Sequence, residues 1–218
     1  MRLLILGATG RTGRHLLDQA LAAGHEVTAF ARTPAALAAS RARVRVLQGD
    51  IADPPSIARA VAGQEAVLSA LGSPTGPPNT VLSDGVGYVL AAMRESGVHR
   101  LLCMSSLGVA AIEGQLGPLY NFLLVPLLLR HVFTDKKRLE ARIQASDAEW
   151  TIVRPGFLTD GPTRGQCQAA LPGVRPSLVP RISRADVAAF MLREVAERRF
   201  LRQAVGLWDE GRWLHAAR

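Results

Sequence analysis

Short apolar runs alternate with segments of helical length along most of this chain, and that alternation restricts its fold more than any other feature. The runs with the length and composition of buried strands are residues 3–7, 27–31, 44–47, 66–71, 101–104 and 151–153. Helical segments are expected at 13–23, 53–63, 80–96 and 135–145, and also from Thr33 and from Ser183. Strands joined by crossover helices form a parallel sheet that is covered on both faces. The pattern therefore predicts an α/β fold with a doubly wound parallel sheet.

The chain is expected to form one domain over residues 1–218, because its length suits a single core and no repeat or linker divides it. Two Pro/Gly-rich stretches interrupt the alternation, at 73–79 and at 156–180. The part that follows the second stretch is expected to form a small elaboration on the substrate side, closing over one edge of the sheet.

The formal net charge is +8, and almost all of the positive charge is arginine, because Lys136 and Lys137 are the only lysines among 26 basic residues. Arginine suits forked contacts with phosphate, so nucleic-acid binding is one interpretation. The arginines, however, are scattered from Arg2 to Arg218 with no block of five like charges. This dispersion favours a solvated basic surface and no nucleic-acid partner.

Cysteine content and hydropathy exclude further classes. The two cysteines, Cys103 and Cys167, are too few for a disulfide framework and show no metal-ligand spacing, so no metal site is expected. Cys103 lies in an apolar strand and is expected to be an inert core thiol. No apolar stretch approaches the ~18 residues that span a bilayer, and the N-terminal run is too short for a signal peptide. A cytoplasmic protein without a membrane partner is predicted.

A glycine-rich motif, Gly7-Ala8-Thr9-Gly10-Arg11-Thr12-Gly13, stands directly between the first strand and the first helix. Gly7 suits a tight turn, Gly10 lets the backbone approach a phosphate, and Gly13 permits close packing of helix on strand. The helix N-terminus then offers free N–H groups to a pyrophosphate. The seven residues are predicted to bind a dinucleotide in a Rossmann-like fold; the alternative is a glycine-rich connection without a ligand.

The end of the second strand indicates which dinucleotide binds. A site for NAD usually has a carboxylate there, but none occurs between Glu26 and Ser40. Arg32 occupies the place instead, and Arg11 projects from the glycine motif. Two guanidinium groups suit a 2′-phosphate, so the predicted cofactor is NADP(H) rather than NAD(H). The alternative is that Arg32 only ends a solvated strand.

Two further strand ends supply candidate cofactor contacts, because open α/β sheets bind ligands at the carboxyl ends of their strands. Asp50 and Ile51 follow the third strand, where Asp50 could accept a hydrogen bond from an adenine amino group. Ala70, Leu71 and Gly72 end the fourth strand, where backbone can pass close to the cofactor.

With these pieces in place, the chain resembles the atypical short-chain dehydrogenases/reductases that carry a GATGxxG motif, and more closely the biliverdin reductase B / flavin reductase group. The resemblance covers nearly the whole chain. Its carriers are the glycine motif, Arg32, Gly49-Asp50, 61–64, Leu71-Gly72, 91–93, Ser105-Ser106, Arg154-Pro155-Gly156 and 182–186. The resemblance implies an NADPH-binding domain with the nicotinamide near Ser105, Ser106 and the Pro155–Gly156–Phe157 loop.

The catalytic residues are expected from the same resemblance. A typical short-chain dehydrogenase uses a Tyr-x-x-x-Lys pair and a serine at the end of the fifth strand. Ser106 or Ser105 fills the serine position and Lys136 the lysine position, but Val132 stands where the tyrosine should be. Ser106 and Lys136 are therefore the catalytic candidates, with Ser106 as a hydrogen-bond donor. Lys136 would contact the nicotinamide ribose or, alternatively, form a surface pair with Glu140.

The remaining candidates are expected to be structural. Tyr88 is expected to serve packing, Arg154 is expected to anchor the loop after the sixth strand, and a lone His131 is more often structural than catalytic. Tyr120 is too far from Lys136 to share adjacent helical turns. The apolar segment 116–129 could line an acceptor pocket, form a partner interface or belong to the core.

The missing tyrosine argues against alcohol and ketone chemistry, and it makes a sugar-nucleotide epimerase improbable. Hydride transfer to a flavin, a quinone or a similar planar acceptor needs less acid–base help from the protein. An NADPH-dependent reductase of such small molecules is the leading hypothesis. A non-catalytic NADP(H)-binding redox sensor is the competing one. The sequence leaves open whether the protein is a monomer or a homodimer.

Overall fold

The fold is described from a computed structural model, whose described residues are 1–37, 44–73, 79–111, 130–165, 167–172, 174 and 180–209. The apolar segment 116–129 and Tyr120 lie outside these ranges. No helix within them is long and apolar enough to cross a membrane.

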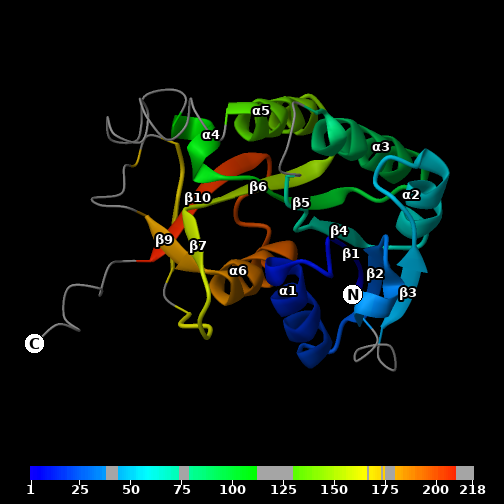
Figure 1. The fold of residues 1–218 in the computed structure, drawn as a ribbon, viewed down its shortest axis with the longest axis horizontal. Coiled ribbons are helices and arrows are strands. Elements are labelled where there is room, and N and C mark those ends of the chain that lie inside the picture. The colour runs from blue at the N-terminus through cyan, green and yellow to red at the C-terminus, as the bar shows by residue number, and fades with distance from the viewer. Residues whose placement is uncertain are drawn as a thin grey trace, which may run out of the picture.

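The central element is an eight-stranded sheet, visible edge-on in Figure 1. Its strands, in spatial order, are β3 (Arg45–Gln48), β2 (Glu26–Ala31), β1 (Arg2–Leu6), β4 (Ala66–Ser69), β5 (Arg100–Met104), β6 (Glu149–Pro155), β10 (Gln203–Asp209) and β8 (Cys167–Ala170). Neighbouring strands are parallel except for β8, which runs antiparallel to β10. The order of the first six strands is that of a doubly wound Rossmann-like sheet, as predicted.

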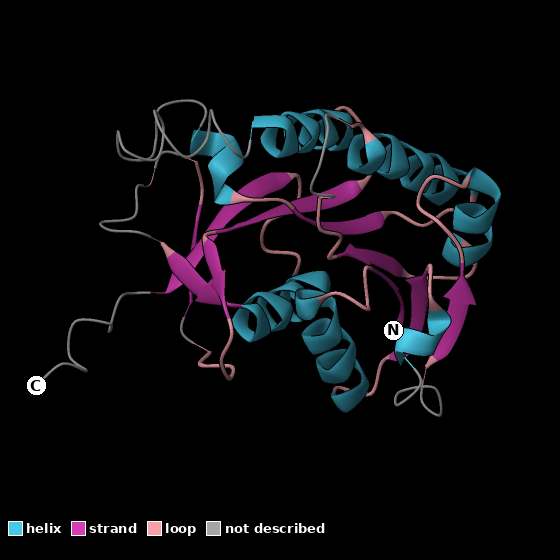
Figure 2. Ribbon diagram, viewed as in Figure 1, coloured by secondary structure: helices cyan, strands magenta, loops and turns pink. Residues whose placement is uncertain are grey.

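Helices cover both faces of the sheet (Figure 2). On one face α1 (Arg11–Ala22) packs against α6 (Arg184–Glu197). On the other, α3 (Val81–Glu95) packs against both α2 (Pro54–Val61) and α5 (Arg130–Gln144), and the short α4 (Leu107–Ala111) contacts α5. The sheet residues alternate between two buried clusters, one under each helical layer, with Leu3 and Ile5 facing α1 and Leu4 and Leu6 facing α2 and α3.

All six predicted strands are present, but the structure also contains elements that the sequence did not reveal. These are α4, a parallel pair formed by β7 (Phe157–Thr159) and β9 (Arg181–Ser183), and strands β8 and β10. Strands β7, β8 and β9 have only three or four residues, too few to show an alternation of apolar and polar residues. No turn-forming residue precedes β10 to mark its start. Helix α5 begins at Arg130 rather than near Asp135, and Thr33 precedes only a short 3₁₀ segment at 34–37 among the described residues.

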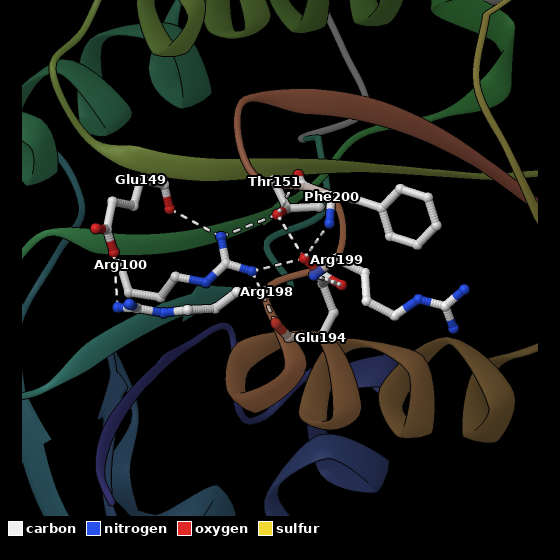
Figure 3. A network of polar contacts seen from close by, with 7 residues as sticks. All are labelled: Arg100, Glu149, Thr151, Glu194, Arg198, Arg199 and Phe200. Carbon is white, nitrogen blue, oxygen red and sulfur yellow. Dashed lines mark hydrogen bonds and ion pairs between the residues drawn. The ribbon is translucent and has the colours of Figure 1, made fainter.

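A buried ion pair joins the sheet to α6 at the amino end of β5 (Figure 3). The Arg100 guanidinium donates to a carboxylate oxygen of Glu194 at 2.9 Å, to the Glu194 carbonyl at 2.8 Å and to Thr151 Oγ1 at 2.9 Å. The Glu194 carboxylate also accepts from the backbone N–H groups of Arg199 and Phe200, at 3.2 and 3.0 Å. Both charged side chains are only 1% exposed, so their hydrogen bonds replace those lost to water.

This network predicts the effect of removing one charge. Arg100→Met leaves the Glu194 carboxylate buried without its counter-ion, and the free energy of unfolding is expected to fall by about 3–5 kcal/mol. Arg198→Gln is the matched control, because Arg198 forms an exposed ion pair with Glu149 and its loss should cost about 1 kcal/mol or less. Urea unfolding measures both. Equal losses in the two variants would contradict the assigned role of the buried pair.

Candidate functional site

The glycine motif forms a turn that leaves no room for side chains between β1 and α1. Gly7 has φ +80°, a conformation that favours glycine, and a Cβ added there would lie 3.0 Å from the backbone of Ala70. A Cβ on Gly13 would overlap the carbonyl group of Gly7. Helix α1 therefore starts directly against the strand that precedes it.

The amino end of α1 has the features of a phosphate cradle. Gly10 is the N-cap, and as a glycine it has no side chain with which to cap the first N–H groups. The turn itself is closed by one bond, from Gly10 N–H to the Gly7 carbonyl at 2.9 Å. Uncapped N–H groups at the positive end of a helix dipole suit an anionic ligand, so these residues fit the pyrophosphate of a dinucleotide.

The parallel sheet brings the other predicted residues to the same edge. Arg32, Ala70, Ser105 and Gly156 each come directly after the last residue of a strand, and Asp50 comes two residues after one. Because β1, β2, β3, β4, β5 and β6 are mutually parallel, their carboxyl ends meet at one side of the sheet. The sequence order changes direction between β1 and β4, which is where such sheets bind nucleotides.

The side chains at the β2 and β3 ends differ in their freedom. Arg32 is exposed, and within the described ranges its guanidinium forms no ion pair. Asp50 Oδ1 accepts from the backbone N–H of Ala52 at 2.9 Å, so one of its oxygens already has a local role. Ile51 is buried, and Gly85 of α3 packs so closely on it that a Cβ there would overlap Ile51.

Arg11 has a partner that the sequence did not reveal. Its guanidinium forms an ion pair with Asp160, and the same carboxylate accepts from Arg184 at 2.8 Å. Asp160 lies about 150 positions along the chain from Arg11. No local spacing indicates this contact, which depends on the pairing of β7 with β9.

Lys136 is buried beneath the site and acts on a backbone group. Its ammonium donates to the carbonyl of Ser105 at 2.9 Å, and burial lowers the pKa of Lys136 from its ordinary value. The alternative of a surface pair with Glu140 is wrong. Glu140 is itself buried and forms a two-pronged pair with Arg154, at 3.1 and 2.5 Å. Arg154 therefore ties β6 to α5, rather than anchoring the loop that follows β6.

The two serines after β5 have separate roles. The Ser105 hydroxyl is buried and has no hydrogen-bond partner among the described residues. Ser106 is partly exposed, and its hydroxyl oxygen accepts from the backbone N–H of Gly108 at 3.3 Å, which caps the short α4. A buried hydroxyl without a partner costs free energy, so Ser105 is the more natural donor toward a ligand.

The loop after β6 is held firmly at its base. The Gly156 N–H donates to the Leu207 carbonyl at 2.9 Å, and the Phe157 N–H donates to the Pro180 carbonyl at 2.8 Å. A Cβ on Gly156 would lie 2.5 Å from that Pro180 oxygen. Phe157 is 42% exposed, so this aromatic residue is accessible beside the carboxyl end of β6.

The described part of α5 offers no phenolic acid one turn before Lys136, because Val132 stands there. Tyr88 of α3 is 38% exposed, so it is covered only in part. The side chain of His131 lies outside the described residues. Cys103 is buried, and burial raises the pKa of its thiol to about 12, as suits an inert core residue. Cys167 lies on β8, not in a loop.

Comparison with known proteins adds to this geometry. Residues 7–198 match the protein family described as NAD(P)H-binding. The chain belongs to this NAD(P)H-binding family. The match begins at the first glycine of the motif and ends after α6, so it includes the cradle and every strand end described above.

Three proteins of different origin are similar to this chain. An uncharacterised chloroplast protein of Arabidopsis thaliana is 30% identical over 75% of this chain and 61% of its own. A Bacillus subtilis protein called an uncharacterised sugar epimerase, YhfK, is 29% identical over 96% of this chain and 94% of its own. The solved structure of ChuY, described as an anaerobillin reductase of Escherichia coli O157:H7, has a TM-score of 0.80 at 24% identity, covering 96% of this chain and 98% of that one.

Further curated relatives, at 27–28% identity, are named as oxidoreductases or as a reductase. The chain spans about three fifths of the length of the Arabidopsis relative. Family membership thus establishes a nicotinamide-nucleotide-binding chain with reductases among its relatives.

The burial of Lys136 predicts a pH dependence of stability. Its pKa is lowered in the folded chain, so at alkaline pH the unfolded chain binds a proton that the folded chain has released, and stability rises with pH. The free energy of unfolding of the wild type minus that of Lys136→Met is therefore expected to increase from pH 7 to pH 10. Lys137→Met, at the exposed neighbouring position, is the matched control for loss of a lysine. Urea unfolding between pH 7 and pH 10 measures these differences. A difference between the wild type and Lys136→Met that does not change with pH would contradict the inference.

Proposed function

We propose that this protein is an NADPH-dependent reductase that transfers hydride to a flavin, a quinone or a similar planar acceptor without a tyrosine acid. The observation that carries the proposal is the combination of a glycine-rich dinucleotide cradle at Gly7–Gly13 with an α5 that has Val132 in the acid's position. The cradle fits a nicotinamide nucleotide, and the α5 sequence fits an acceptor that needs no phenolic proton donor.

The residues that would hold the nucleotide follow the strand ends. The backbone of the Gly7–Gly13 turn would bind the diphosphate, and Arg11 and Arg32 would bind the 2′-phosphate. Asp50 and Ile51 would flank the adenine, and residues 70–72 would pass along the cofactor. When bound, the nucleotide supplies the hydride.

On the nicotinamide side, this chain's residues would orient the nicotinamide and the acceptor and would exclude water. They would not transfer protons. The unpartnered Ser105 hydroxyl and the Ser106 hydroxyl would donate to the nicotinamide amide or to the acceptor. Lys136 holds the Ser105 carbonyl at 2.9 Å, so it is a positioning residue for this strand end. Pro155, Gly156 and the exposed Phe157 would border the acceptor, where an aromatic ring can stack on a planar molecule.

Planar acceptors are favoured for a chemical reason. A conjugated ring system delocalises the charge that arrives with hydride, so protonation can follow from water. ChuY, whose solved structure is described as that of an anaerobillin reductase, shares this fold at 24% identity.

A redox sensor that binds NADP(H) without oxidising it is the second candidate. It is favoured by the same Val132 and by the engagement of the Lys136 ammonium with a backbone carbonyl. The sensor and the reductase would share the cradle and the arginines, and they differ only in whether NADPH is consumed.

The deciding experiment measures NADPH consumption by the purified protein with FMN, riboflavin and a quinone, each followed at 340 nm without oxygen. The reductase proposal expects multiple turnovers with at least one acceptor. Tight NADPH binding with no turnover across the panel would favour the sensor instead. Absence of both binding and turnover would overturn the two proposals together.

The arginine assignment predicts a change in cofactor preference. Arg32→Gln removes a charge-assisted contact to the 2′-phosphate, so the Kd for NADPH is expected to rise about ten-fold while that for NADH stays unchanged. Arg59→Gln, on the exposed side of α2, is the control and should change neither constant. Fluorescence titration measures all four values. Equal Kd values of NADPH and NADH in the wild type would already refute the preference.

A further inference from the structure

We propose that Asp160 tunes cofactor discrimination by competing with the cofactor's 2′-phosphate for the Arg11 guanidinium. This inference rests on the proposed function, because it takes Arg11 as a ligand of that phosphate. It assigns a role to a residue in the loop after β7. This loop belongs to the stretch 156–180, which is recognisable in the sequence only as rich in proline and glycine.

The position of Asp160 follows from strand pairing. β7 and β9 are parallel, and their last residues, Thr159 and Ser183, are directly paired. The next residue on each strand is therefore Asp160 on one side and Arg184 on the other. Their side chains meet in an ion pair of 2.8 Å. The carboxylate is thus placed by backbone register rather than by a chance surface contact.

Two helix N-termini converge on the same carboxylate. Arg184 is the first residue of α6 and Arg11 is the first residue of α1, and these two helices pack against each other. Partial burial alone would raise the pKa of Asp160, but the hydrogen bond from Arg11 and the charges of Arg184 and Arg11 outweigh it and lower the pKa. Asp160 is therefore an anion paired with the first residue of the helix whose amino end forms the phosphate cradle.

The two arginines differ in their freedom to leave this carboxylate. The Arg184 side chain is 12% exposed, whereas those of Arg11 and Asp160 are 67% and 64% exposed. An exposed ion pair is weak and exchanges partners readily. A phosphate arriving beside α1 can thus draw Arg11 away while Arg184 keeps Asp160 in place.

The loop that carries Asp160 is fixed independently of Arg11. The backbone N–H groups of Arg164 and Gly165 both donate to Asp186 of α6, at 2.8 and 2.9 Å. Gln19 of α1 contacts Thr163 at 3.4 Å. These contacts do not involve Arg11, so the exchange of its partner leaves the loop backbone held. The competition is therefore one of charge and can be tested by removing the carboxylate charge alone.

The experiment compares Asp160→Asn with the wild type in titrations with NADP⁺ and NAD⁺ without any acceptor. The Kd for NADP⁺ is expected to fall about two- to five-fold, the range of a weak exposed ion pair, and the Kd for NAD⁺ to stay unchanged. Asp18→Asn, an equal charge change on an exposed position of α1, should alter neither value. In an Arg11→Gln background the effect of Asp160→Asn should disappear, since its target is gone.

Each other outcome has a definite meaning. Equal tightening of NADP⁺ and NAD⁺ would overturn the inference, because it would place Arg11 on the diphosphate that both share. An unchanged Kd for NADP⁺, or an effect that persists without Arg11, would also overturn it. These failures differ from that of the NADP preference on which the inference rests, which is refuted by a wild type that binds NADP⁺ no more tightly than NAD⁺. They also differ from that of the reductase itself, which is refuted by absence of NADPH turnover.

Discussion

The contact between Gly13 and the carbonyl of Gly7 is the constraint on which the candidate site depends. Because no side chain fits there, α1 starts directly against the end of β1, and its first N–H groups remain at the open edge of the sheet. The parallel strands then bring Arg32, Ala70 and Ser105 to the same edge. One steric condition thus aligns a helix dipole with the strand ends that complete a nucleotide site.

The polar groups at the amino ends of the strands and those at the carboxyl ends serve different purposes. At the amino end, Arg100 and Glu194 are buried, and they form hydrogen bonds with each other, with backbone groups and with Thr151. At the carboxyl end, Lys136 holds a backbone carbonyl, while the Ser105 hydroxyl has no partner among the described residues. The first arrangement fastens α6 to the sheet. The second leaves a donor available where a ligand would lie.

Repeating patterns account for what the sequence could predict. The six strand runs, the glycine spacing and the Ser183 cap are local features and were found correctly; the Ser183 side chain accepts from Asp186 N–H at 3.0 Å. Among the helices, the start of α5 and the helix expected from Thr33 were wrong. Three contacts could not be predicted from local patterns, because they depend on how the strands and helices pack: Arg11 with Asp160, Arg154 with Glu140, and Lys136 with Ser105. The strand β10 was missed because it completes an existing sheet, so its neighbours rather than its own pattern determine it. Whether the predicted site residues bind a cofactor remains a prediction.

The two outermost strands, β3 and β8, have a consequence for the protein in concentrated solution. Each is only four residues long. β3 begins with the exposed Arg45 and ends with the exposed Gln48, and such short borders offer little template for a strand from another molecule. An eight-stranded sheet would otherwise present long rows of unpaired backbone groups. Short borders therefore allow this wide sheet to resist edge-to-edge aggregation.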